Sequence, residues 1–314
     1  ARVRLMALSH PDLDTYETAY LALDRPILGT QAIPLVPDGS KWHRSSDADD
    51  LTDSIYPARR AYDGYAGFWT KPSTAEVDTT WYYYIGANTA VMTFDFVAIL
   101  NHNFGTIHAS GGALTITLEV SDSITFAGAL SIPITVTTSS SDNRIMKLSL
   151  AHDAGNAQRY TDVPYARLKS TRAATNYVPR LGELVLARRY QQKHRPRMPH
   201  DDTSLHGIAE KSETMGGVIS VSTFATGRRH LSVNMRETDT TQIANIKAWF
   251  RGTNYGTRPF VWIENPNTAP NSWHWMVRDD PDLDMPTQEF ADRNLTIEAT
   301  EQGPENCYLD RGVY

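Results

Sequence analysis

Alternation of apolar and polar residues dominates the middle of the chain and predicts a series of β-strands. In "ALTITLEVS", the apolar residues Leu114, Ile116, Leu118 and Val120 fall on one face of the expected strand. The same period of two recurs in "LSIPITVT" at 130–137 and in "MKLSL" at 146–150. Because these short segments are separated by turn signals and no βαβ rhythm appears, they are typical of an antiparallel sandwich.

One segment departs from this alternation. "FDFVAILNHNFG", residues 94–105, is an almost continuous apolar run. A strand of this kind is expected to be covered on both faces. We therefore predict a central strand with Phe94, Phe96, Ala98 and Leu100 on one side and Val97 and Ile99 on the other.

The run ends in the polar triplet Asn101-His102-Asn103, which has two interpretations. The side chains offer donors and acceptors at a strand end, where they would suit sugar hydroxyls or a metal ion. Alternatively, they bond neighbouring backbone groups and shape a turn. We favour the turn, because spacing along the chain identifies no partner that would make His102 a catalytic base.

The period changes once in the C-terminal part. "DTTQIANIKAWFRG", residues 239–252, places Ile243, Ile246, Trp249 and Phe250 at helical intervals. Asp239 and Gln242 have capping-box spacing, and Gly252 is placed to end the helix. Strand alternation precedes and follows this segment. The pattern predicts a smaller β-sandwich that carries one helix.

The chain as a whole is therefore expected to be mainly β, with two domains. We predict an N-terminal arm at 1–30, a β-sandwich at 31–190, a linker at 191–210, the smaller β domain at 211–301 and a C-terminal tail at 302–314. The basic segment "RRYQQKHRPRMPHDD", 188–202, suits a phosphate or nucleic-acid contact or an exposed linker. We favour the linker, because no aromatic stacking platform accompanies the charge.

Composition narrows the function classes. The net charge of −6 argues against a dedicated nucleic-acid binder. No apolar segment is long enough to predict a membrane span, and the N-terminal residues do not predict a signal peptide. The single Cys307 excludes an internal disulfide framework. No spacing of nucleophile, base or paired carboxylates predicts an enzyme, and no motif predicts a cofactor.

Aromatic residues are abundant, with 7 Trp and 15 Tyr. They suit a sugar-stacking platform, a core or a subunit interface. We favour core or interface. The interface candidates are Trp42, Tyr65, Phe68, Trp249 and Phe250. For carbohydrate binding, the candidates are Trp69 together with Asn101, His102 and Asn103.

The acidic segment "DADDLTD", 47–53, is a weak calcium candidate through Asp47, Asp49 and Asp53. It lacks the central Gly and the bidentate Glu of an EF-hand loop. We favour a solvated acidic loop, and predict no metal.

Two resemblances add to this reading. The segments "FDFVAILNHNFG", "GALTITLEVSDSITF", "RYTDVPYARLKS" and "LGELVLARR" resemble a discoidin-like, galactose-binding jelly roll. More narrowly, they are similar to its version in tail proteins of tailed bacteriophages. The matching elements are Phe96–Leu100 with His102 and Asn103, then Ser121-Asp122, Tyr165–Leu168 and Gly182-Glu183-Leu184.

The C-terminal part resembles the tube-end domains of siphophage minor and distal tail proteins. The resemblance rests on "HLSVNMRE", the 243–250 helix, Gly256, "RPFVWIE" and "LTIEATE". Together the resemblances imply a virion structural subunit of a tail tip or baseplate, made in the cytoplasm of a bacterial host. It would form a homo-oligomeric ring and link the tail tube to hub, fibre or receptor-binding proteins. The alternative is a carbohydrate-binding module for adhesion to a host-surface glycan.

Overall fold

The protein is described from a computed structural model, which defines residues 27–31, 40–44, 50–63, 67–73, 79–85, 92–110, 112–136, 144–147, 160–173, 177–191, 197–213, 219–237, 240–255, 257–263, 273–279 and 293–301. The chain divides into two compact units. Unit 1 comprises residues 1–23 and 30–189, and unit 2 comprises residues 24–29 and 190–314. Each unit is described by itself.

Unit 1 contains a five-stranded antiparallel sheet in the order β2-β3-β10-β6-β7. Its strands are β2 (Lys41–Arg44), β3 (Thr80–Tyr84), β10 (Tyr165–Arg172), β6 (Leu114–Ser121) and β7 (Leu130–Ile134). Leu168 of β10 lies opposite Tyr83 on one side and Leu118 on the other. This register brings the apolar alternation of the neighbouring strands onto one face.

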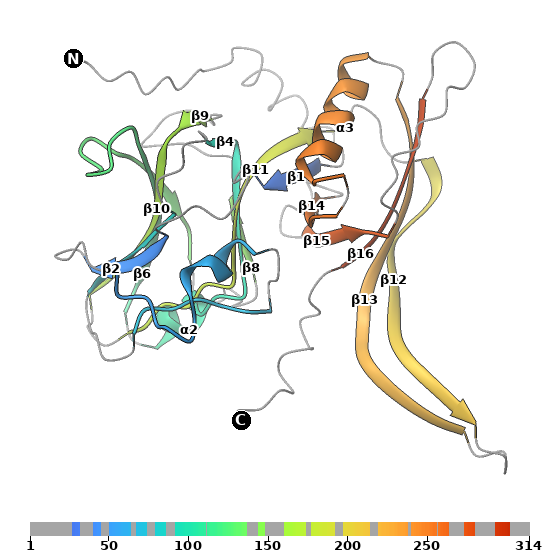
Figure 1. The fold of residues 1–314 in the computed structure, drawn as a ribbon, viewed down its shortest axis with the longest axis horizontal. Coiled ribbons are helices and arrows are strands. Elements are labelled where there is room, and N and C mark those ends of the chain that lie inside the picture. Colours follow the sequence, from blue (N-terminus) through green and yellow to red (C-terminus); the bar gives the residue numbers. More distant parts are fainter. Residues whose placement is uncertain are drawn as a thin grey trace. The chain divides into compact units, whose positions relative to one another are not determined.

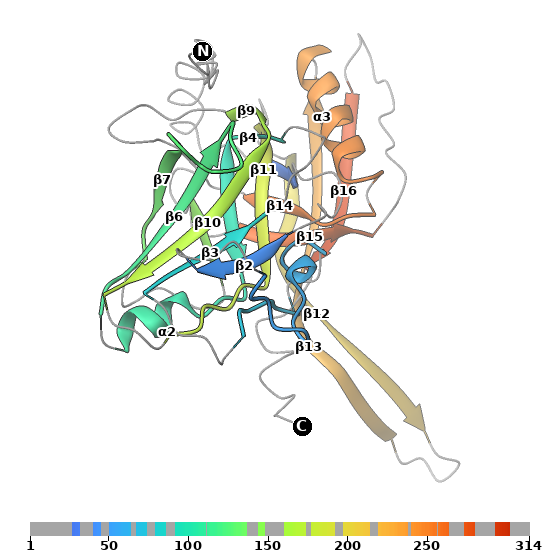
Figure 2. The same cartoon turned by 60° about the vertical axis from the view of Figure 1, so that its left-hand side comes forward.

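Facing this sheet in unit 1 are β11 (Glu183–Gln191), β5 (Phe96–Leu100) and β8 (Arg144–Lys147), which are adjacent in that order (Figures 1 and 2). β4 (Met92–Phe94) pairs with β9 (Tyr160–Val163). Two short helices complete the unit: η1 (Ala58–Ala61) and α2 (Phe104–Ala109). The core between the layers takes Trp42, Trp81, Tyr83, Ile116, Leu118 and Leu168 from the first sheet and Val97, Ile99, Leu184 and Leu186 from the second. The predicted β-sandwich is confirmed.

Residues 94–100 are not one strand, contrary to the prediction. Asp95 interrupts the apolar run and separates β4 from β5. The Asp95 backbone N–H donates to the carbonyl of Ala187 at 2.9 Å, and its carboxylate accepts the backbone N–H of Arg189 at 2.8 Å. As a result, Phe94 belongs to the same core cluster as Val97 and Ile99, rather than to the face of Phe96. The expected burial of both faces of β5 is confirmed, because all five of its residues are buried.

Unit 2 contains one sheet, in which the described strands follow the order β12-β13-β16-β15-β14-β1. They are β12 (Arg197–Glu213), β13 (Ile219–Glu237), β16 (Arg293–Glu301), β15 (Trp273–Arg278), β14 (Phe260–Ile263) and β1 (Ile27–Gln31). Helix α3 (Thr240–Gly252) lies along this sheet (Figure 1). Ile246 and Trp249 of α3 share a buried cluster with Leu231, Val233, Phe260, Trp262, Met276, Ile297 and Ala299. Among the described residues, helix α3 covers one face of this sheet, in the position that a second sheet would take in a β-sandwich.

The predicted helix ends at Gly252, as the sequence indicates. Its expected cap Asp239 lies outside the described residues, and Gln242 lies inside the helix. The predicted linker, 191–210, is wrong for 197–210, because these residues form most of β12. Turn-forming residues there did not prevent pairing, since β12 accommodates them with several register shifts against β13. Residues 27–30 of the predicted arm belong to β1.

Strands β12 and β13 form a long ribbon (Figure 1). Their pairing runs from Arg197 opposite Asn234 to Glu213 opposite Ile219. The other edge of β13 pairs with β16 only from His230 to Glu237. Within the described part of the chain, residues 219–229 therefore pair with β12 alone. No helix among the described residues has the length and apolarity needed to cross a membrane.

Candidate functional site

An aromatic stack with basic side chains against it lies in unit 1, on the segments that flank η1. Tyr56 and Trp69 stack face to face, with ring centroids 4.0 Å apart and ring planes at 9°. Both rings are partly exposed. Phe68, next to Trp69, is 50% exposed. We call Tyr56, Phe68 and Trp69, with the cations Arg60, Lys71 and Arg180 that contact them, the Trp69 platform.

The three cations contact the rings of the platform. The Arg60 guanidinium lies 5.6 Å from the centroid of Tyr56 and 5.3 Å from that of Phe68. The Lys71 ammonium is 4.8 Å from the Tyr56 centroid, and the Arg180 guanidinium is 5.3 Å from that of Trp69. Lys71 also pairs with Asp53 at 3.4 Å. The arrangement thus combines aromatic surface with N–H donors, the two components of a typical polar-ligand site.

The platform is tied to the sandwich core through Thr70. Thr70 and Leu181 exchange two backbone hydrogen bonds, of 2.7 and 3.0 Å. The buried indole Nε1–H of Trp42 donates to Thr70 Oγ1 at 3.0 Å, and the Thr70 hydroxyl donates to the carbonyl of Tyr56 at 2.9 Å. Trp42 therefore acts from the core, where it is 1% exposed, and not at an open interface.

Asn103 connects the polar triplet to the platform. Its Nδ2 donates to the carbonyl of Val178 at 2.9 Å, and its Oδ1 accepts the backbone N–H of Arg180 at 2.7 Å. Both functional groups of the amide are thus used to hold the segment that carries Arg180. Arg180 in turn lies over Trp69. Asn103 therefore helps to position a platform residue and does not form a separate site.

His102 and Asn101 shape the turn itself. His102 is fully buried, stacks on Phe104 at 4.8 Å, and accepts the Phe104 backbone N–H through Nδ1 at 3.2 Å. Asn101 has a φ of 47°, a conformation that Asn tolerates better than most residues. Gly182 fits tightly beside it, since a Cβ there would lie 2.7 Å from the Asn101 Cβ. The geometry favours the turn interpretation over direct ligand contact by His102.

The remaining candidates are distributed as follows. Asp47, Asp49 and Tyr65 lie outside the described residues. Asp53 orders its own loop, because its carboxylate accepts the Ile55 backbone N–H at 2.9 Å, and it pairs with Lys71. Among the described residues, no group of three or more His, Cys, Asp or Glu side chains is placed to hold a metal ion.

The interface candidates of unit 2 occupy different environments. Trp249 is fully buried and packs edge-on against Phe260 at 5.1 Å, so it is a core residue. Phe250 is partly buried, and packs against the exposed Tyr255 at 5.7 Å. The guanidinium of Arg278 lies 5.1 Å from the Phe250 ring.

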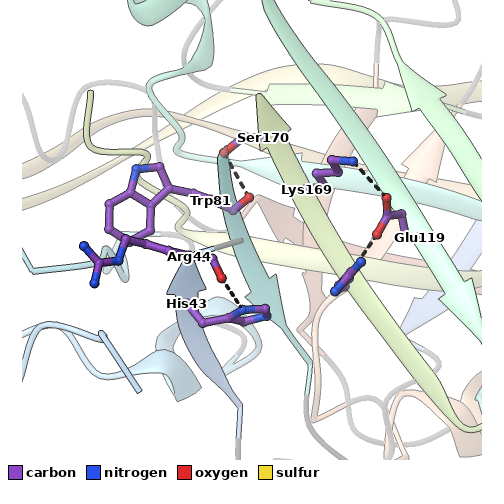
Figure 3. A network of polar contacts seen from close by, with 7 residues as sticks. His43, Arg44, Trp81, Glu119, Lys169 and Ser170 are labelled. Atoms are coloured by element: carbon purple, nitrogen blue, oxygen red, sulfur yellow. Dashed lines mark hydrogen bonds and ion pairs between the residues drawn. The ribbon is translucent and has the colours of Figure 1, made fainter. Parts of the chain in front are cut away.

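A second cluster lies on the outer face of the five-stranded sheet (Figure 3). Glu119 bonds Arg167 Nε at 2.6 Å and Lys169 Nζ at 3.4 Å. The Arg167 guanidinium lies between the rings of Tyr82 and Phe126, 4.1 Å from each centroid. Phe126 comes from the β6–β7 connection, where its φ is 55°. Because Glu119 pairs with both cations and Arg167 contacts Phe126, this cluster holds that connection against the sheet.

Tyr84, beside this cluster, provides a stability prediction. It is 7% exposed, packs edge-on against Phe126, and its hydroxyl has no hydrogen-bond partner in the described structure. We expect Tyr84→Phe to raise the free energy of unfolding by about 1 kcal/mol, since it removes a buried unsatisfied hydroxyl. Urea denaturation of both proteins measures the change. A clear loss of stability in the variant would show that the hydroxyl is bonded.

The same substitution should alter the response to alkaline pH. Burial, with a smaller contribution from Tyr165, raises the pKa of Tyr84 from 10.0 to about 12. The unfolded chain therefore loses this proton first, so ionisation of Tyr84 lowers the stability of the parent protein between pH 10 and 12 and has little effect below pH 10. Tyr84→Phe should show a shallower decline than the parent protein over this range.

The fold and the platform define unit 1 as a β-sandwich with an aromatic, cation-bearing surface on its connecting segments. No family model matches the chain, and no curated protein matches it. Among solved structures, a mutant of chitosan-binding module 1 from a chitosanase/glucanase of Paenibacillus sp. IK-5 is similar. Its TM-score is 0.32 and its sequence identity is 17%, over 50% of this chain and 98% of the module.

A second similar structure is CpGH89CBM32-4 of Clostridium perfringens, in complex with GlcNAc-α-1,4-galactose. Its TM-score is 0.24 and its identity 12%, over 49% of this chain and 93% of that protein. With TM-scores this low, the ligands of the two proteins are not transferred to this chain.

Proposed function

We propose that unit 1 binds carbohydrate at the Trp69 platform. The observation that carries this proposal is the partly exposed Tyr56–Trp69 stack, with Phe68 half exposed beside it and cationic donors against the rings. The apolar C–H face of a sugar packs against aromatic surface, while guanidinium and ammonium N–H groups donate to its oxygens. The platform offers both within one surface.

The support for this site is also architectural. The platform is held by the Thr70–Leu181 pairing and by Asn103, so its rings are positioned before any ligand arrives. A rigid platform loses little conformational freedom on binding, which favours affinity. Of the platform residues, the sequence suggests Trp69 for carbohydrate binding and Phe68 for an interface. It does not single out Tyr56, Arg60, Lys71 or Arg180.

Glycan-array screening of the full chain tests the proposal, followed by titration calorimetry on the best ligand. We expect Trp69→Ala and Phe68→Ala each to weaken binding by about tenfold or more, as for a central aromatic contact. Phe68→Ala is not expected to disturb the fold, because this side chain is half exposed. Its effect on binding therefore cannot be attributed to misfolding. Tyr255→Ala is the matched control, an exposed aromatic of unit 2.

Two results would contradict the proposal. Absence of binding to any glycan of the array by the correctly folded chain would contradict carbohydrate recognition. Unchanged affinity in both platform variants, or an equal loss in Tyr255→Ala, would place the binding site elsewhere.

The β12–β13 ribbon favours a second candidate function, that of a structural subunit in a larger assembly. A two-stranded ribbon without a third strand has marginal stability, and residues 219–227 carry no charge. An uncharged edge that pairs with no third strand among the described residues is a candidate for pairing with another chain. This feature supports the expectation of a homo-oligomeric ring in a phage tail tip or baseplate, with unit 2 as the assembling part and unit 1 presented for adhesion.

Light scattering coupled to size-exclusion chromatography tests the assembly proposal. We expect the full chain to form a defined oligomer, and a variant with residues 208–225 replaced by a short Gly-rich turn to be monomeric. Lys247→Ala, on the exposed side of α3, is the control that should leave the oligomer unchanged. A full chain that remains monomeric at high concentration would contradict ribbon-mediated self-assembly.

A further inference from the structure

The charge of the Trp69 platform is opposite in sign to that of the chain. The whole protein has a net charge of −6. Yet Arg60, Lys71 and Arg180 all contact the platform rings. Lys71 is paired with Asp53 at 3.4 Å. Arg60 has no such pair among the described residues, so its positive charge is available to a ligand that meets this surface.

Arg60 is the cation best placed to bind an anion. Among the residues that the structure describes, no carboxylate forms an ion pair with it, and its guanidinium contacts the rings of Tyr56 and Phe68. No acceptor among the described residues bonds its side-chain N–H groups. Its N–H groups lie in the guanidinium plane and point outward from the edge. That edge is the part that binds a carboxylate in a bidentate manner.

We infer that the platform takes an acidic glycan, in which a uronate carboxylate pairs with Arg60 while its sugar ring packs against the half-exposed Phe68. This inference rests on the proposed carbohydrate function and specifies its ligand class. The pairing would be charge-assisted and partly shielded from water by Phe68 and Tyr56, so it should exceed the contribution of an ordinary surface ion pair. The neutral form of the same glycan would lose this contact and keep only the stacking.

Matched pairs of polysaccharides test the inference. Polygalacturonate, alginate and hyaluronan are each compared with their carboxyl-reduced forms, in which the carboxylates are replaced by primary alcohols. We expect at least one acidic polymer to bind about tenfold more tightly than its reduced form. Raising the salt concentration should weaken the acidic complex and leave the neutral one nearly unchanged.

Variants then assign the preference to Arg60. We expect Arg60→Gln to bind the acidic and reduced polymers with similar affinity, and Arg60→Lys to keep part of the preference. Lys247→Gln removes the same charge from an exposed position of α3 and should behave like the parent chain. Thermal melting of each variant checks that the fold is intact.

Each outcome separates the inference from the function beneath it. Equal binding to acidic and reduced polymers, or binding to neutral glycans alone, overturns the acidic-ligand inference and leaves the carbohydrate function standing. A preference that survives Arg60→Gln overturns the role of Arg60. Failure to bind every acidic polymer, every reduced polymer and every glycan on the array overturns both.

Discussion

Replacing Asp95 with alanine is expected to lower the free energy of unfolding by about 3–5 kcal/mol, the range for breaking a buried ion pair from one side. Asp95 is fully buried, and its carboxylate lies 4.0 Å from Arg189 Nε. Desolvation lowers the pKa of Arg189 to about 10, so the guanidinium is still charged at neutral pH. Without Asp95, that buried charge loses this ion pair. The Arg189 backbone N–H also loses its acceptor. Chemical denaturation followed by circular dichroism measures the loss.

Asp95→Asn separates these two contributions. The amide oxygen can still accept the Arg189 backbone N–H, but the negative charge is gone. The free energy of unfolding of Asp95→Asn should therefore lie between that of the parent chain and that of Asp95→Ala. If both variants were as stable as the parent, another group would balance the charge of Arg189. The interruption between β4 and β5 at Asp95 would then not depend on this ion pair.

The second large effect is expected from Trp249→Ala in unit 2. This substitution should destabilise unit 2 by about 3–5 kcal/mol, as for other buried Trp and Phe truncations. Trp249 is fully buried and contributes to the cluster that joins α3 to the sheet. Loss of the indole leaves a cavity against Phe260, which packs on it edge-on. Differential scanning calorimetry of the full chain should show a lower unfolding temperature for one transition.

Tyr255→Ala provides the comparison for Trp249. Tyr255 follows α3, is 60% exposed and contacts Phe250. We expect its truncation to cost less than about 1 kcal/mol, as at most surface positions. A Trp249→Ala protein that melts like the parent but fails to self-associate would instead support the interface role that the sequence suggests for this residue.

Local patterning predicts much of this fold because the apolar period is a direct record of which face is covered. Leu114, Ile116, Leu118 and Val120 all lie in the core cluster, as their alternation indicates. The Ile246 and Trp249 spacing likewise predicts the buried side of α3. Asp95 shows where this reasoning stops. A single acidic residue in an apolar run was interpreted as part of a strand, because its partners lie near Ala187 and Arg189, far along the chain.

The sequence does not predict the platform as a group of residues, because its members are also far apart along the chain. Tyr56 and Arg60 lie in a loop-rich segment, and Arg180 follows a different strand altogether. Nothing in their spacing shows that Arg180 lies over Trp69. The sequence predicts that the triplet forms a turn, but its connection to Arg180 through Asn103 is seen only in the structure. The ribbon was missed because proline and polar residues in 191–210 are typical of linkers.

The hydrogen bonds of the Asn103 amide should affect the entropy of ligand binding at the platform. Since Arg180 and Thr70 are both fixed by hydrogen bonds to the strand ends of the sandwich, ligand binding need not order a loop. Calorimetry should therefore show a small entropic penalty, and association should follow a single concentration-dependent phase. The ligand selectivity of this surface could therefore be changed by substituting its side chains, with little change to the backbone that carries them.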